Sequence, residues 1–241
     1  MIDRHEMFIR ASEYTGFHKK LALLAAPYLD REWSVADIGC GLALIDFHLA
    51  HSVKSITAMD SDAEILARVE SRIDEELAAG HAEAGRISTL RKRTSDAGSG
   101  GERWDAVVLG FSDVDGEAMG RLLTLADHRG IIIMHGQRDE GIFDPVPSVD
   151  RAEHSASQVE GYLRGAGYGF RKSVVDLQFG QPFRTIDDIH EFLRSYEAER
   201  LIYSVEERII KTKRYDYPYY LPRNMRVAVF IVATDVMASR I

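Results

Sequence analysis

The stretch Asp37-Ile38-Gly39-Cys40-Gly41 decides the fold. It follows residues 33–36, which are typical of the end of a buried strand, and precedes residues 42–50, which predict the start of a helix. A second acid, Asp60, closes the next apolar strand at 55–59. Strand, glycine turn, helix, strand and acid follow one another at nucleotide-type cofactor sites on the edge of a parallel sheet. The glycines let the backbone pass close to a ligand, and the acid is placed to accept hydrogen bonds from ribose hydroxyls.

The turn differs from the dinucleotide fingerprint, which needs three glycines and rests a pyrophosphate on a helix N-terminus. Leu44 stands where its last glycine would be, and Asp37 two residues before the first glycine suits a cation better than a phosphate. The acid-x-Gly-x-Gly turn resembles that of the class I S-adenosylmethionine (SAM)-dependent methyltransferases. SAM carries an ammonium and a sulfonium and no phosphate. The third glycine of that family is missing, and Ala43 stands in its place.

The resemblance implies a set of cofactor contacts. Gly39 and Gly41 would pass under the methionine part of SAM, and Asp37 would reach its ammonium directly or through water. Asp60 would hold the ribose hydroxyls, and Asp96 follows the third strand, where the family often places an acid against the adenine amino group. The residues expected at the cofactor are Asp37, Gly39, Cys40, Gly41, Asp60, Ser61, Asp96 and Phe111.

Each of these residues also has a structural interpretation. Asp37 and Asp60 could cap the helices that follow them, Asp96 could be a solvated loop acid, and Phe111 could belong to the core. Cys40 is expected to fill the tight turn rather than to act as a nucleophile.

Methyl transfer from a sulfonium is a single displacement, so the enzyme mainly places the acceptor and excludes water. His135 ends the fifth strand and is the candidate general base, with a hydrogen-bonded loop histidine as the alternative. The residues expected at the acceptor are Tyr14, His18, Asp113, Tyr217, Tyr219 and Tyr220. The tyrosines of 215–222 could instead form a rigid connector packed by its rings, and Asp113 could cap a helix.

The pattern predicts an α/β fold with a doubly wound, mostly parallel seven-stranded sheet covered by helices on both faces. Strands and helices alternate through residue 135, and the strands at 104–111 and 130–135 are continuous apolar runs. The resemblance implies that the last strand, 226–233, is antiparallel. We expect a single domain over 1–241, with an N-terminal helix at 5–29, a core at 33–180 and 226–234, and a helical insertion at about 181–225. Helices are expected within this insertion at about 186–203 and 205–213. The insertion is expected to cap the active site, with a homodimer interface as the alternative.

Composition narrows the choice of partners. The chain has 241 residues and a net charge of −8, which argues against nucleic acid as a main partner. Its single cysteine cannot form an internal disulfide, and no apolar run approaches the roughly 20 residues that span a bilayer. No His, Cys and Glu cluster has metal-ligand spacing, so no metal is expected. These features predict a cytoplasmic protein without membrane contact.

The leading hypothesis is therefore a SAM-dependent methyltransferase that acts on a small molecule. A non-catalytic SAM-binding or scaffold protein on the same fold is one alternative, because fold does not fix function. An NAD-type oxidoreductase is the other, and the glycine spacing disfavours it.

Overall fold

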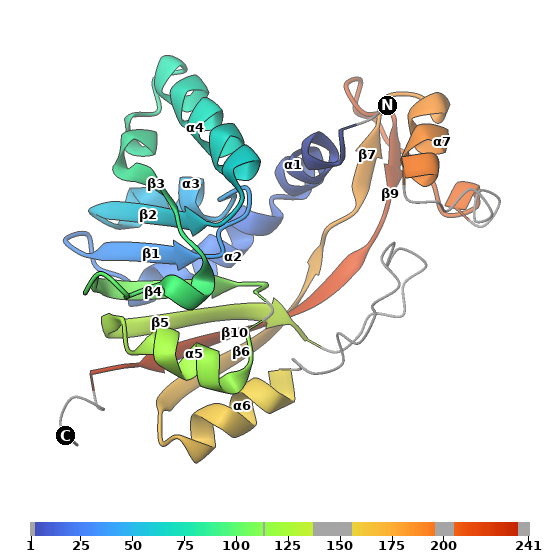
Figure 1. Ribbon diagram of the computed structural model, residues 1–241. Helices are drawn as coiled ribbons and strands as arrows, with labels where there is room; N and C mark the ends of the chain where they lie inside the picture. The colour runs from blue at the N-terminus through green and yellow to red at the C-terminus, as the bar shows by residue number, and fades with distance from the viewer. Residues whose placement is uncertain (1–2, 113, 137–155, 196–204, 236–241) are drawn as a thin grey trace. The chain divides into compact units, whose positions relative to one another are not determined.

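A computed structural model describes residues 3–112, 114–136, 156–195 and 205–235 (Figure 1). The described residues form two compact units. The core unit comprises residues 18–112, 114–136, 156–174 and 227–235. The second unit comprises residues 3–17, 175–195 and 205–226.

The main sheet has seven strands in the order β3-β2-β1-β4-β5-β10-β6. Strands β3, β2, β1, β4 and β5 are parallel to one another, and β10 pairs antiparallel with β5 (Figure 1). This confirms the predicted doubly wound sheet and its antiparallel last strand. The strands are β1 Ser34–Ile38, β2 Ser55–Asp60, β3 Ile87–Arg91, β4 Trp104–Gly110, β5 Ala126–His135, β6 Gly169–Gln178 and β10 Asn224–Ala233.

Helices pack on this sheet because its strands are apolar on both sides. One hydrophobic cluster joins Ile38 and Val107 of the sheet to Leu122 of α5 and Leu163 of α6. Side chains alternate along a strand, so Val35 and Asp37 of β1 point to the opposite face from Ala36 and Ile38. The helices of the core are α2 Phe17–Ala25, α4 Ala63–Ala78, α5 Gly116–Leu123 and α6 Ala156–Gly165, with short 3-10 turns at Ala26–Tyr28, Ala82–Arg86 and Thr94–Asp96.

The predicted N-terminal helix is two helices. Gly16 has φ 63° and ends α1 (Arg4–Thr15), and α2 begins at the next residue. A left-handed glycine is a common helix end, because it costs no Cβ clash there.

The helix predicted after the glycine turn is also shorter than expected. Ala43 has φ 51°, which is incompatible with a right-handed helix, so α3 covers only Asp46–Leu49 and passes into a 3-10 turn at Ala50–Ser52.

The second unit contains a small sheet of its own, ordered β7-β9-β8. Its strands are β7 Gln181–Phe183, β8 Ile210–Lys211 and β9 Tyr219–Leu221. Met7 of α1 packs in one cluster with Phe183 of β7 and Ile189 of α7 (Ile186–Ser195). The expected helix at 186–203 is confirmed as far as Ser195, and residues 196–204 lie outside the described part. The helix expected over 205–213 is wrong at its end, because β8 pairs there with β9.

Within the described ranges, no helix combines the length and the apolar character needed to cross a membrane.

Candidate functional site

The glycine turn is held at the carboxyl end of β1 by backbone hydrogen bonds. The N–H groups of Gly39 and Cys40 donate to the carbonyl oxygen of Met59 at 2.8 and 2.9 Å. Gly39 has φ 79° and Gly41 has φ 52°, a region that glycine adopts at little cost. The sequence therefore places glycine where the turn requires positive φ.

Asp60 connects this turn to helix α4. Its Oδ2 accepts a hydrogen bond from Gly41 N–H, and its Oδ1 accepts one from Asp62 N–H, both at 3.0 Å. The N-cap of α4 is Asp62, whose carboxylate accepts from Glu64 and Ile65. A carboxylate offers about four acceptor positions, so Asp60 can hold the turn and still accept further hydrogen bonds.

The turn is open on its ligand side. A Cβ placed on Gly41 would meet nothing within 4 Å, and one on Gly39 would lie 3.9 Å from Ser112 Cβ and 4.0 Å from Thr94 Oγ1. Thr94 follows β3 and Ser112 follows β4, so three strand ends meet around Gly39. Ala43, in the place of the family's third glycine, adopts the positive φ that a glycine would adopt there.

Two carboxyl groups are buried behind the turn. Asp37 is 2 % exposed and Asp46, on α3, is 0 % exposed. Oδ1 of Asp37 and both oxygens of Asp46 have no hydrogen-bond donor among the described residues. Burial raises the pKa of Asp37 to about 7; a hydrogen bond from Asp46 partly opposes this effect, and the charge of Asp60 adds to it. Burial, and then the neighbouring Asp37, raise the pKa of Asp46 well above its usual range.

Asp46 is the residue that the sequence analysis missed. The sequence pattern places it only in the helix predicted after the turn and indicates no role for it at the site. The signal that could have identified it is its place inside an apolar stretch, Leu44-Ile45-Asp46-Phe47.

Cys40 lies in the turn beside these acids. Its Sγ contacts the carbonyl oxygen of Gly41 at 3.4 Å. Burial first, and then the nearby carboxyl groups of Asp37, Asp46 and Asp60, raise the pKa of its thiol far above the usual range. A thiol that resists ionisation is a poor nucleophile, which agrees with a space-filling role.

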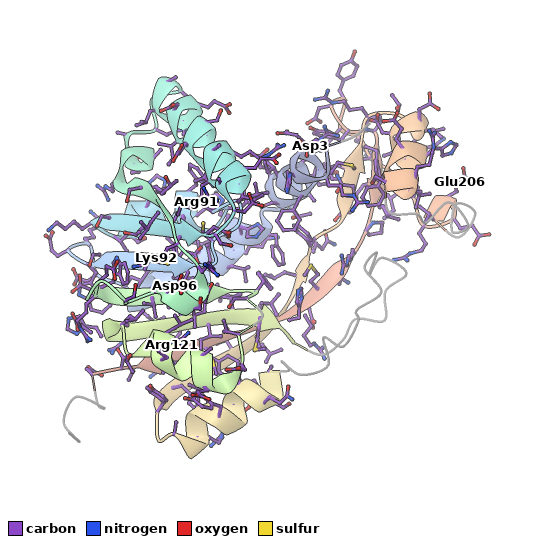
Figure 2. The ribbon with its side chains drawn as sticks, viewed as in Figure 1. Asp3, Arg91, Lys92, Asp96, Arg121 and Glu206 are labelled. Atoms are coloured by element: carbon purple, nitrogen blue, oxygen red, sulfur yellow. The ribbon has the colours of Figure 1, made fainter. Side chains whose placement is uncertain are left out.

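Two of the residues expected at the cofactor line the same cavity. Ser61 and Asp96 border a space of about 510 Å³ together with Arg91, Lys92 and Arg93. Figure 2 labels Arg91, Lys92 and Asp96 at this place. Asp96 is oriented by Ser95 Oγ, which donates to Oδ1 at 2.9 Å, and by Arg93, 3.6 Å from Oδ2.

Phe111 and His135 lie together at the ends of β4 and β5. Their rings are 4.9 Å apart. Phe111 has φ 51°, a conformation that is unusual for a bulky residue, and its N–H donates to Ile133 at 2.7 Å. Strained backbone of this kind clusters at functional sites. The candidate base, His135, thus lies beside a strained residue, Phe111, that is itself a candidate cofactor contact.

The remaining residues expected at the acceptor belong to different parts of the chain. His18 belongs to the core unit and is 7 % exposed, and its pKa is lowered to about 3 by burial, with smaller effects from His48 and Arg72. It is therefore neutral at physiological pH. Asp113 lies outside the described residues.

The tyrosines belong to the second unit, where three of them form a cluster. Tyr14 stacks on Tyr220 with ring centroids 5.0 Å apart, and its edge contacts Tyr217 at 5.9 Å. Tyr219 instead packs against the apolar cluster around Phe183, because successive side chains of β9 face opposite sides.

Guanidinium groups cover this tyrosine cluster. Arg10 and Arg184 lie 5.7 and 5.6 Å from the ring centre of Tyr217, and Arg214 lies 4.6 Å from that of Tyr14. These are cation–π distances.

The carboxyl groups and the open backbone at the turn suit a ligand that carries a positive charge. Buried carboxyl oxygens without a donor favour a positive group, and the open glycine backbone admits it. No group of three or more His, Cys, Asp and Glu side chains in the described ranges could hold a metal ion.

No family model and no curated protein matches the sequence. Solved structures do match. A putative methyltransferase from Bacillus halodurans C-125 superposes with a TM-score of 0.56 at 14% identity, over 91% of this chain and 99% of that one. Magnesium protoporphyrin IX methyltransferase from Synechocystis PCC 6803, solved with bound SAM, gives 0.52 at 14% identity over 96% and 85%.

A putative RNA methyltransferase from Pyrococcus horikoshii matches with a TM-score of 0.54 at 13% identity, over 96% of this chain and 98% of that one. Such low identities establish a shared fold and leave the acceptor open. The chain has the fold of the class I SAM-dependent methyltransferases, as its glycine turn predicts.

Proposed function

We propose that this protein is a SAM-dependent methyltransferase that acts on a small-molecule acceptor. The observation that carries the proposal is the glycine turn after β1, whose N–H groups are fixed by Met59 and Asp60 and which lies against the buried Asp37. A turn of this kind suits a ligand with a nucleoside at one end and a positive charge at the other.

The residues of this site have separate roles in the proposal. Asp37 offsets the positive amino group of SAM, and the open backbone at Gly39 and Gly41 admits its methionine part. Asp60 accepts from the ribose hydroxyls with the acceptor positions that the turn leaves free. Ser61 and Asp96 line the cavity that receives the adenine. When bound, SAM would supply an electrophilic methyl group on a sulfonium, and S-adenosylhomocysteine would be the leaving group when an acceptor takes that methyl.

His135 is the proposed general base. It is exposed at the end of β5, and the Phe111 ring beside it restricts its orientation. A proton leaving an acceptor hydroxyl or amine would pass to its imidazole.

The tyrosine cluster keeps its proposed role in binding the acceptor. Arg10 and Arg184 contact Tyr217, and the described residues give neither of them a carboxylate partner. Rings and guanidinium groups together suit a flat acceptor that carries a carboxylate or phosphate. The overall charge of −8 disfavours a long nucleic acid as the acceptor.

Calorimetry with S-adenosylhomocysteine and with NADH tests the cofactor assignment. We expect binding of the first and none of the second. Binding of NADH alone would reverse the proposal in favour of an oxidoreductase. A turnover screen with SAM over phenols, amines, thiols and carboxylates then tests catalysis. Cofactor binding without turnover of any acceptor class would favour a non-catalytic SAM-binding protein.

A further inference from the structure

Asp37 and Asp46 form an isolated pair of acids inside the core unit. The charge that acts on the pair from outside it is that of Asp60 at the end of β2, which is also negative. The pair in turn acts on the thiol of Cys40 in the turn. Among the described residues, the groups that act on the pair include no cation to offset two ionised carboxylates.

The carboxyl oxygens of Asp37 and Asp46 indicate how the pair avoids having both groups ionised at once. A carboxylate only accepts hydrogen bonds, so two ionised carboxylates cannot bond to each other. Within the described part of the chain, both oxygens of Asp46 lack a donor, as does Oδ1 of Asp37. One proton between the two groups creates the missing donor and removes one of two like charges from a buried place.

The deeper acid is the better place for this proton. Both acids are buried, with exposed fractions of 0 % for Asp46 and 2 % for Asp37, but Asp37 lies on β1 two residues before Gly39, at the end of the strand where the turn is open. A negative charge on Asp37 can meet a cation that arrives over the turn, and a charge on Asp46 would remain inside apolar surroundings.

We propose that Asp46 is a positioning residue of the cofactor site, which stays protonated and donates a hydrogen bond to the Asp37 carboxylate, leaving Asp37 with the single negative charge that meets the amino group of SAM. The inference rests on the proposed function. It assigns Asp46 a role through Asp37, and no contact with SAM is required of it.

The pH dependence of cofactor binding follows. The pKa of Asp37 in the free protein is raised to about 7, so below that pH its carboxyl group must lose a proton to the solvent when the ligand cation binds. Affinity for S-adenosylhomocysteine should therefore rise about tenfold per pH unit below neutral pH and level off above it. Methylthioadenosine lacks the amino acid portion, so its affinity should not change with pH.

Two substitutions separate a protonated Asp46 from a charged one. Asp46→Asn keeps a neutral hydrogen-bond donor of the same size, and we expect it to retain the affinity and the pH midpoint of the wild type. Asp46→Leu removes the donor, and the midpoint should move to higher pH, with affinity at pH 7 reduced about tenfold. Asp74→Asn, at an exposed position of α4, is the matched control.

Calorimetry of both ligands from pH 6 to 8.5 measures these effects. Infrared spectroscopy adds a second readout, because a carboxylic-acid C=O band should persist at pH 8 and disappear in Asp46→Asn. Loss of affinity at all pH values in folded Asp46→Asn would show that Asp46 acts as a charged carboxylate and overturn the inference. Equal pH profiles for the two ligands on the wild type would also overturn it, whether or not the variants fold.

Failure of the wild type to bind S-adenosylhomocysteine at any pH would overturn the proposed function, and the inference with it. Binding without pH dependence would overturn the inference alone.

Discussion

Replacing Asp60 by alanine should weaken both the glycine turn and the cofactor site. The wild-type carboxylate accepts hydrogen bonds from the N–H groups of Gly41 and Asp62, each at 3.0 Å. Hydrogen bonds to charged groups contribute roughly 1.5–3 kcal/mol each. Asp60 is half-buried and the freed N–H groups can reach water, so we expect a loss of about 2–4 kcal/mol in the free energy of unfolding. A domain stability of roughly 5–15 kcal/mol leaves the variant folded.

The free energy of binding should fall by an amount comparable to the loss in the free energy of unfolding. Two ribose hydrogen bonds to the carboxylate contribute at least about 3 kcal/mol, which corresponds to a loss of about 100-fold in affinity for S-adenosylhomocysteine. Asp60→Asn keeps one acceptor oxygen, so its losses should be intermediate. Asp74→Ala on the exposed side of α4 is the control.

Urea denaturation and calorimetry measure the two effects separately. Stability of Asp60→Ala within 0.5 kcal/mol of the wild type, on the order of an ordinary surface substitution, would refute the anchoring of the turn by this carboxylate. Unchanged affinity in the folded variant would remove Asp60 from the cofactor site.

Three further outcomes follow from the structure. Gly39→Val should lower the free energy of unfolding by roughly 1–3 kcal/mol, because the backbone φ of 79° strains a branched residue. It should also abolish binding of S-adenosylhomocysteine in calorimetry. Gly80→Val, at φ 90° with open space around it, is the control and should lose stability without losing binding. The pKa of Asp37 in the folded protein lies above its ordinary 3.8, so the folded chain holds a proton that the unfolded chain releases. The free energy of unfolding should therefore fall by up to roughly 4 kcal/mol as pH rises from about 4 to 7. In Asp37→Asn, urea denaturation should show little change in stability over that pH range. Tyr217→Ala should leave affinity for S-adenosylhomocysteine within about twofold and lower kcat/KM for the acceptor at least tenfold, on the order of one lost stacking or cation–π contact; unchanged turnover would remove the tyrosine cluster from acceptor binding.

The central sheet could be predicted from local patterns because each strand carries its own signal. The continuous apolar run of β4 and the turn at Gly39 and Gly41 depend on residues that are neighbours in the chain. Parallel strands with helices on both faces are the ordinary outcome of such runs. The antiparallel β10 followed from the resemblance and not from any local pattern.

The second unit could not be predicted in this way because its contacts join distant parts of the chain. Phe8 and Phe17 of the N-terminal helices contact Phe179 at 5.0 and 4.6 Å. Ile210 and Lys211 form β8 only because β9 offers backbone partners. This strand pairing overrides the helical periodicity of residues 205–213.

The buried acid at position 46 shows why a motif describes a site incompletely. The sequence pattern places Asp46 near the start of the helix predicted at 42–50, where a carboxylate is ordinarily favourable. Ala43, at φ 51°, delays the helix, and the turn then directs Asp46 inward, beside Asp37. A lone charge there would cost several kcal/mol, so the chain can keep both acids only if they share a proton or meet a cation. The same desolvation that makes the pair costly in the free protein makes it selective for a positive ligand, because a neutral ligand leaves that cost uncompensated.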